Sequence, residues 1–146
     1  MTRINYTFRF ERAIEFGKAK HGDSLDDNGV NYFDAHPCVV TDLLSHVTDD
    51  EDILIAGLLH DTIEDTDCTY EEIADAFGSR VADLVNEVTH EGKKDNKGYY
   101  FPRLDTRDAI LIKFADRLSN ISRMQSWPKG RRAQYLKKSK FWRSEV

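Results

Sequence analysis

The apolar residues of this 146-residue chain recur mostly at helical spacing, and that periodicity limits its fold more than any other feature. Val40, Leu43, Leu44 and Val47, for example, repeat three and four residues apart, as on the buried face of an amphipathic helix. No segment shows the convincing apolar–polar alternation of a half-buried strand. The sequence therefore predicts an all-α fold, and the chain length predicts a single domain over residues 1–146.

Cap and turn residues divide the chain into helices. Pro37 fits the first turn of a helix, where its missing N–H costs nothing, and Thr69 with Glu72 has the spacing of a capping box. Gly78 is placed to end the helix that Thr69 begins. We expect helices over residues 10–21, 37–47, 51–60, 70–77, 81–88, 110–121 and 131–142, with polar loops over residues 23–34 and 90–105.

Composition excludes several classes of protein. No stretch approaches the roughly 20 apolar residues of a membrane-spanning helix, and residues 1–5 lack the layout of a signal peptide. The two cysteines, Cys38 and Cys68, are too far apart for a CxxC pair, which argues against a disulfide framework or a zinc ribbon. Such cysteine usage suits a reducing compartment. We therefore expect a cytoplasmic protein without a membrane partner.

Charge is divided unevenly along the chain. The net charge is −5, yet residues 22–79 contain many acids and no Lys or Arg, whereas most of the basic residues follow residue 79. The first half is suited to attract cations, and the second could offer anions a counter-charge. A solvated acidic face would have the same composition, so charge alone leaves both interpretations open.

Histidines among these carboxylates indicate a metal site. The adjacent pair His60-Asp61, at the end of an apolar segment, offers one nitrogen and one oxygen ligand. Neighbouring helical residues point about 100° apart, so further ligands have to come from elsewhere. His36, just before Pro37, and Asp116, within an apolar helical segment, are the best candidates. Two nitrogens and two oxygens suit Mn²⁺ or Fe²⁺ with open coordination positions.

Each of these residues also has a simpler explanation. Asp116 could pair with Lys113, Arg117 or Arg123 of its own helix, and His36 could be a packing residue at a helix end. The remaining histidines, His21, His46 and His90, lack an acidic partner at ligand-like spacing apart from the Glu91 beside His90, and we predict no metal role for them.

Two further acids follow the His-Asp pair. If the helix continued past His60, Glu64 and Asp65 would stack one turn beyond His60 and Asp61 and add carboxylates beside a bound ion. The alternative is that these two acids only cap the chain reversal before Thr69.

The order of these residues resembles the HD superfamily of metal-dependent phosphohydrolases. Three segments are similar to the hydrolase domain of RelA/SpoT proteins and to small stand-alone alarmone hydrolases of the metazoan SpoT-homologue type. They are HDxxEDT over residues 60–66, FGxxVAxLVxxVT over residues 77–89 and KxADRxxN over residues 113–120. The resemblance implies a helical bundle of the HD type. It also implies that the metal ligands are His36, His60, Asp61 and Asp116, with Mn²⁺ as the usual ion.

The resemblance further implies a reaction. Glu64 and Asp65 fall on the acidic pair thought to orient and activate the attacking water, and Asn120 falls on a position that contacts the nucleotide. Lys113 and Arg117 of the same segment are expected to bind the substrate and offset developing charge. The family removes pyrophosphate from the 3′ position of guanosine tetra- or pentaphosphate, so we expect a phosphorylated nucleotide as the substrate.

One segment departs from the family pattern. These hydrolases usually carry a basic pair before the first metal histidine, whereas residues 21–29 contain Asp23, Asp26 and Asp27 and no Lys or Arg. Acids at that place would repel a polyphosphate by about 1 kcal/mol for each exposed close pair. The polar loop over residues 91–103, with Lys93, Lys94, Lys97, Tyr99 and Tyr100, could supply the missing phosphate and base contacts or could be a surface connection.

Two alternatives remain open at this level. One is a hydrolase of another nucleotide or of a phosphorylated nicotinamide cofactor. The other is a binding protein that keeps the fold and uses the basic segment 129–143, with Trp127, Tyr135 and Trp142, to bind nucleic acid or a protein. Because the sequence pI is about 5.5, nucleic acid is the weaker prediction.

Overall fold

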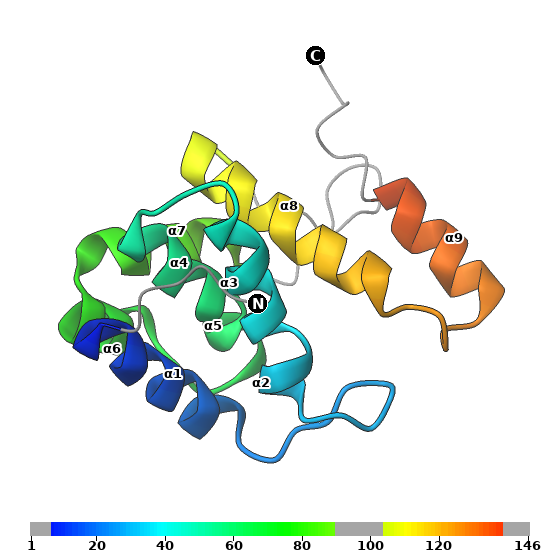
Figure 1. Cartoon of the computed structure of the whole chain (residues 1–146), viewed down its shortest axis with the longest axis horizontal. Coiled ribbons are helices and arrows are strands. Elements are labelled where there is room, and N and C mark those ends of the chain that lie inside the picture. The colour runs from blue at the N-terminus through cyan, green and yellow to red at the C-terminus, as the bar shows by residue number, and fades with distance from the viewer. Residues whose placement is uncertain (1–6, 90–103, 139–146) are drawn as a thin grey trace.

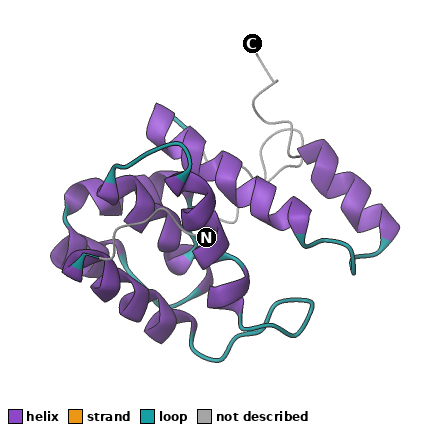
Figure 2. Cartoon of the chain, viewed as in Figure 1, coloured by secondary structure: helices purple, strands orange, loops and turns teal. Residues whose placement is uncertain are grey.

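The computed structural model describes residues 7–89 and 104–138, and every regular element in these two stretches is a helix (Figures 1 and 2). The prediction of an all-α fold is therefore confirmed. An isolated bridge between Leu25 and Asn31 closes the loop after the first helix. The helices are α1 (Phe8–His21), α2 (Tyr32–Ala35), α3 (Pro37–Ser45), α4 (Glu51–Leu58), α5 (Thr62–Asp65), α6 (Tyr70–Phe77), α7 (Ser79–Val88), α8 (Arg107–Ser122) and α9 (Lys129–Lys138).

Local sequence signals place several helix ends correctly. Pro37 begins α3, and the Thr69 hydroxyl and the Glu72 carboxylate form the predicted capping box of α6. Gly78 ends α6 with φ of 97°, a left-handed backbone conformation that favours glycine. Each boundary has its own local cause: a proline without an N–H at the start of α3, side-chain capping at Thr69, and a left-handed glycine at the end of α6.

Other boundaries differ from the prediction. The expected loop over residues 23–34 contains the start of α2, whose first turn Asn31 caps by accepting from the Asp34 N–H. Val47, predicted on a buried face, lies beyond the end of α3 and is 67% exposed. The last helix begins at Lys129 instead of residue 131, and residues 139–142 of the prediction lie outside the described residues.

Helix α4 lies at the centre of the packing. It contacts α1, α3, α7 and α8, and its residues from Ile53 to Leu58 are buried on every side. A helix that is apolar all round belongs in a core. The buried apolar residues of the other helices form one core with it. His60, which follows the C-terminal end of α4, is therefore held in the interior, where α4 packs against α3 and α8.

Within the described stretches, no helix is long and apolar enough to cross a membrane. Cys38 and Cys68 are both free thiols there, in agreement with the absence of a disulfide framework. The cytoplasmic location, and a single domain over all of residues 1–146, remain predictions.

The contact of α3 with α4 depends on a glycine. A Cβ atom at Gly57 would lie 2.4 Å from Cδ1 of the buried Leu44, so we expect Gly57→Ala to lower the unfolding free energy by about 1–3 kcal/mol. A Cβ atom at Gly130 in α9 would contact nothing, so Gly130→Ala should not lower the unfolding free energy. Urea unfolding of both variants in EDTA measures the difference. Equal midpoints would contradict the close packing of α3 on α4.

Candidate metal centre and adjoining pocket

The His60–Asp61 pair lies in a break between two helices. α4 ends at Leu58 and α5 begins at Thr62, so the prediction of one helix running through His60 is wrong. The Thr62 backbone N–H and hydroxyl both donate to the Leu59 carbonyl, at 3.1 and 2.8 Å, and hold the turn between the helices. On a continuous helix the two side chains would diverge. In the break both are buried and line the same pocket.

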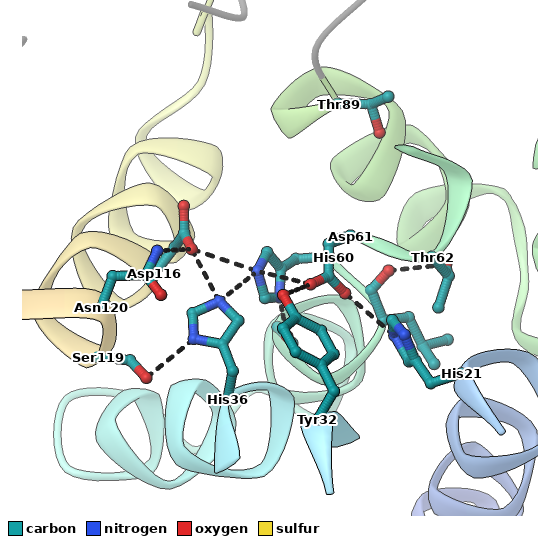
Figure 3. A network of polar contacts seen from close by, with 12 residues as sticks. His21, Tyr32, His36, His60, Asp61, Thr62, Thr89, Asp116, Ser119 and Asn120 are labelled. Carbon is teal, nitrogen blue, oxygen red and sulfur yellow. Dashed lines mark hydrogen bonds and ion pairs between the residues drawn. The ribbon is translucent and has the colours of Figure 1, made fainter. Parts of the chain in front are cut away.

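Three side chains from separate elements converge beside this break (Figure 3). The His36 Nε2 atom lies 3.2 Å from Nε2 of His60 and 2.9 Å from Oδ1 of Asp116. His60 Nε2 lies 3.4 Å from the same Asp116 oxygen. One ligand atom from each residue fits within a sphere that could hold a metal ion. The sequence separation of these residues means that only the packing of α3, α4 and α8 brings them together.

Hydrogen bonds on the far side of each imidazole fix its orientation. His60 Nδ1 lies 2.8 Å from the Gly57 carbonyl, which can only accept, so Nδ1 carries the hydrogen. In the neutral ring Nε2 then presents a lone pair to the cluster. His36 Nδ1 makes the equivalent contact with the Ser119 hydroxyl at 2.9 Å. Partners of this kind orient histidines that bind metals, and the donor set fits a divalent cation.

Asp61 lies next to His36, His60 and Asp116 but is not one of the three residues whose ligand atoms meet. Its Oδ2 atom accepts from the Tyr32 hydroxyl at 2.5 Å and lies 3.8 Å from His60 Nε2. Its Oδ1 atom lies 3.2 Å from Nε2 of His21, in an orientation that does not form a regular hydrogen bond. The sequence predicts no role for His21, because its acidic partner is far away along the chain and no local spacing reveals it.

Charge at the centre is strongly coupled. Burial alone would raise the pKa of Asp116, but the Lys113 charge and the hydrogen bonds of His36 and His60 lower it well below its usual value. Burial would lower the pKa of His60, but the charges of Asp61 and Asp116 raise it to about 9. Burial and the charge of His60 lower the pKa of His36. Without an ion, these charges favour a proton on His60, which together with Lys113 offsets the two buried carboxylates.

A pocket of about 200 Å³ opens beside this centre, and every site residue predicted from the sequence lines it. Tyr32, Val88 and Tyr135 also line it and were not predicted. The predicted members are His36, His60, Asp61, Glu64, Asp65, Lys113, Asp116, Arg117 and Asn120. The pocket is therefore lined by α2, by His36 just before α3, by the α4–α5 turn, and by α5, α7, α8 and α9.

Glu64 and Asp65 reach this pocket from the short helix α5. Helix α4 does not continue into this segment, because the chain turns at residues 59–61. The Asp65 N–H donates to the Asp61 carbonyl at 2.9 Å, so these two residues lie four positions apart on the first turn of α5. Partial desolvation and the charges of Asp61 and Glu64 raise the pKa of Asp65 to about 6. A carboxylate with that pKa is ionised at neutral pH and basic enough to accept a proton.

Three residues of α8 form the opposite wall. Lys113 Nζ lies 3.2 Å from Oδ2 of Asp116, so the pairing considered for Asp116 on its own helix does form, and both groups are buried. The Asn120 amide donates to the Tyr135 hydroxyl at 2.8 Å and lies 3.4 Å from Asp116 Oδ1. The Arg117 guanidinium lies 4.8 Å from the centre of the Tyr135 ring.

A second pocket, of about 440 Å³, adjoins the first and shares Tyr32, Asn120 and Tyr135 with it. The Trp127 ring forms part of its wall, with the Arg131 guanidinium 3.8 Å from the ring centre. The Tyr135 ring meets Trp127 edge-on at 5.3 Å. The aromatic side chains of the basic C-terminal segment that the structure describes are therefore engaged at this pocket.

The acidic loop does not present unpaired charge to this pocket. Asp26 Oδ2 lies 3.1 Å from the Arg123 guanidinium, and Asp27 Oδ2 lies 3.1 Å from that of Arg131. Backbone N–H groups of residues 28 and 30 also donate to Asp26, at 2.9 Å. The expected repulsion of a polyphosphate by this loop is therefore offset, because bases from the end of α8 and from α9 neutralise it.

Several predicted features lie elsewhere. His46 is exposed at the end of α3, as expected for a residue without a metal role. His90, Glu91, the lysines and tyrosines of the 91–103 loop, and Trp142 lie outside the described residues, so their predicted contacts stay predictions.

The chain is similar to known proteins over most of its length. The HD domain family matches residues 13–97. A guanosine-3′,5′-bis(diphosphate) 3′-pyrophosphohydrolase of Aquifex aeolicus is 39% identical over 137 residues, which are 88% of this chain and 20% of that protein. The chain therefore spans about a fifth of that relative.

Shorter relatives match along most of their own length. The guanosine-3′,5′-bis(diphosphate) 3′-pyrophosphohydrolase MESH1 of Danio rerio is 34% identical, over 91% of this chain and 79% of that protein. A solved structure, described as a metazoan ortholog of SpoT that hydrolyzes ppGpp, superposes with a TM-score of 0.78 at 28% identity, covering 93% of this chain and 84% of that one.

The convergent donors predict stabilisation by a divalent ion. We expect Mn²⁺ at about 100 times its Kd to raise the unfolding free energy by about 2.7 kcal/mol, because only the folded chain assembles the three ligands. His60→Gln should remove this effect, whereas His46→Gln, at an exposed site, should keep it. Thermal unfolding with and without Mn²⁺ measures both. Equal metal shifts in the two variants would rule out His60 as a ligand.

Proposed function

The chain belongs to the HD domain family, and we propose that it is a metal-dependent hydrolase that removes pyrophosphate from the 3′ position of guanosine tetraphosphate or pentaphosphate. One observation carries the proposal: the candidate metal ligands, the acidic pair and the candidate substrate residues all line one pocket. The names of the relatives that match along most of their length support the choice of substrate.

His36, His60 and Asp116, with Asp61 beside them, are the residues that would hold the ion. We take Mn²⁺ as the first candidate and Fe²⁺ as the second, since both accept imidazole and carboxylate ligands. When bound, such an ion polarises a phosphoryl oxygen and makes water more acidic. These donors fit a divalent cation because imidazole nitrogens and carboxylate oxygens lie together, almost completely buried, beside the pocket.

The protein's own groups then divide the chemical work. Asp65, with its pKa near 6, takes the proton of the attacking water, and Glu64 helps to orient that water. Water attacks the phosphorus next to the ribose, and the bond from that phosphorus to the 3′ oxygen breaks. Pyrophosphate is released, and the remaining product is GDP or GTP with a 3′ hydroxyl. Lys113 and Arg117 on the opposite wall offset the developing negative charge.

The adjoining pocket suits the nucleoside. Its ion pairs leave it close to neutral, and its Trp127 and Tyr135 rings offer apolar surface to a base and a sugar. Asn120 lines both pockets and lies within reach of a group that spans them. A neutral aromatic pocket would also accept another nucleoside, so a different phosphorylated nucleotide or a phosphorylated nicotinamide cofactor is the second candidate substrate.

Product analysis separates these candidates. The purified chain is incubated with Mn²⁺ and a nucleotide panel that includes guanosine tetraphosphate, and we expect GDP and pyrophosphate. Asp61→Asn should lower kcat/KM by at least about 10²-fold, the scale of removing one electrostatic group from an active site. Activity on another nucleotide of the panel alone would identify that nucleotide as the substrate instead. Full activity of the Asp61→Asn variant would contradict the proposed metal centre.

A second variant separates proton transfer from metal binding. Asp65→Asn should lower kcat by about 10²- to 10⁴-fold, the usual contribution of a general base, while the Kd for Mn²⁺ stays near that of the wild type. Asp67→Asn is the matched control, because Asp67 lies two residues away and its side chain is 91% exposed. Loss of Mn²⁺ binding in Asp65→Asn would assign Asp65 to the ligand set instead.

A further inference from the structure

Both oxygens of Asp61 contact side chains that lie outside the predicted catalytic set. Tyr32 binds Oδ2 and His21 lies against Oδ1 (Figure 3). We propose that His21 and Tyr32 are positioning residues that hold the Asp61 carboxylate at the edge of the metal centre and thereby set its affinity for the ion. This inference rests on the proposed metal-dependent function.

The Tyr32 hydroxyl binds Oδ2 of Asp61, the carboxylate oxygen that faces His60. Oδ2 of Asp61 is 2.5 Å from this hydroxyl and 3.8 Å from His60 Nε2. The bond therefore holds one carboxylate oxygen next to the convergent ligands. A carboxylate oxygen has a second lone pair, so accepting from Tyr32 leaves it able to face a cation.

His21 restrains the other oxygen. Its Nε2 atom is 3.2 Å from Asp61 Oδ1, and neither atom has a hydrogen-bond partner among the described residues. Both side chains are almost completely buried, at 3% and 7% exposure. At this distance the buried imidazole limits how far the carboxylate can turn on that side. Rotation of the carboxylate about its Cβ–Cγ bond would break the contacts at both oxygens together.

The two positioning residues are themselves held by packing. The His21 ring lies 5.2 Å from the Tyr32 ring and 6.2 Å from the Phe33 ring, measured between centres. α1 approaches Phe33 closely because residue 17 is glycine, where a Cβ atom would lie 2.3 Å from Phe33 Cε1. The end of α1 and the start of α2 are thereby fixed against the α4–α5 turn. A carboxylate gripped by such packed groups is pre-organised for binding.

A matched pair of tyrosine variants tests the proposal. Tyr32→Phe removes the hydroxyl and keeps the ring, and we expect it to raise the Kd for Mn²⁺ by about ten- to a hundredfold, the usual effect of losing a partner behind a metal ligand. Tyr70→Phe removes a hydroxyl that donates to the exposed Asp83 at 2.6 Å, so it makes the same chemical change away from the centre. Calorimetric titration of the full chain with Mn²⁺ measures Kd, and thermal unfolding in EDTA measures metal-free stability.

The histidine is tested in the same way. His21→Leu deletes the donor at similar volume, and His21→Gln keeps an N–H donor, so the glutamine variant should bind Mn²⁺ more tightly than the leucine variant. If His21→Leu fails to fold, the comparison of Tyr32→Phe with Tyr70→Phe decides.

The outcomes separate this inference from the proposed function. A wild-type chain that binds neither Mn²⁺ nor Fe²⁺ overturns both. Wild-type binding with an unchanged Kd in Tyr32→Phe overturns the positioning role alone, even where stability in EDTA falls, because that result describes a purely structural hydroxyl. A raised Kd in Tyr32→Phe with an unchanged Kd in Tyr70→Phe supports it.

Discussion

The carboxylates of Asp61 and Asp116 are almost completely buried beside the pocket, and the need to balance their charge constrains the arrangement around them. An ionised carboxylate in the interior costs several kcal/mol unless charges and hydrogen bonds compensate it. Here the compensation for Asp61 and Asp116 comes from α1, α2 and α8, from His36 just before α3 and from His60 after α4, which are far apart in sequence. Removing any one element would expose or unbalance the centre. The apolar core around α4 holds these elements together, and the contacts at the two carboxylates restrict how the elements lie against one another.

Much of this arrangement is predictable because its signals are local. Pro37 and the Thr69–Glu72 box set helix ends through their own backbone chemistry, so the sequence locates them. The candidate site was predictable for a related reason. A buried acid within an apolar segment needs a partner, so the apolar neighbours of Asp116 indicate a paired carboxylate. The combination with His36 and His60-Asp61, and the resemblance of residues 60–66 and 113–120 to a known family, point to a metal site. The roles of these residues in metal binding and catalysis remain proposals.

The features that the sequence did not predict depend on contacts between distant segments. The helical pattern of residues 51–60 continues to His60, but the turn at residues 59–61 follows from Thr62 bonding back to Leu59 and from the surrounding helices. His21 has no acidic partner at ligand-like spacing in the sequence, and its contact with Asp61 arises only when α1 packs beside the α4–α5 turn. The acidic loop similarly looks repulsive in the sequence, whereas in the fold it pairs with Arg123 and Arg131, about 100 positions further along the chain.

This last pairing has a consequence for protein engineering. The loop over residues 23–31 and the segment around Arg123 and Arg131 are electrostatically complementary, so neither is independently exchangeable. A chimaera that received only a basic loop from a similar hydrolase would confront two arginines with like charge and leave them without their carboxylates. The compensating change has to be made in the α8–α9 region of the same molecule. In similar hydrolases, the charges of the segments that correspond to residues 23–31 and to Arg123 and Arg131 should accordingly change together.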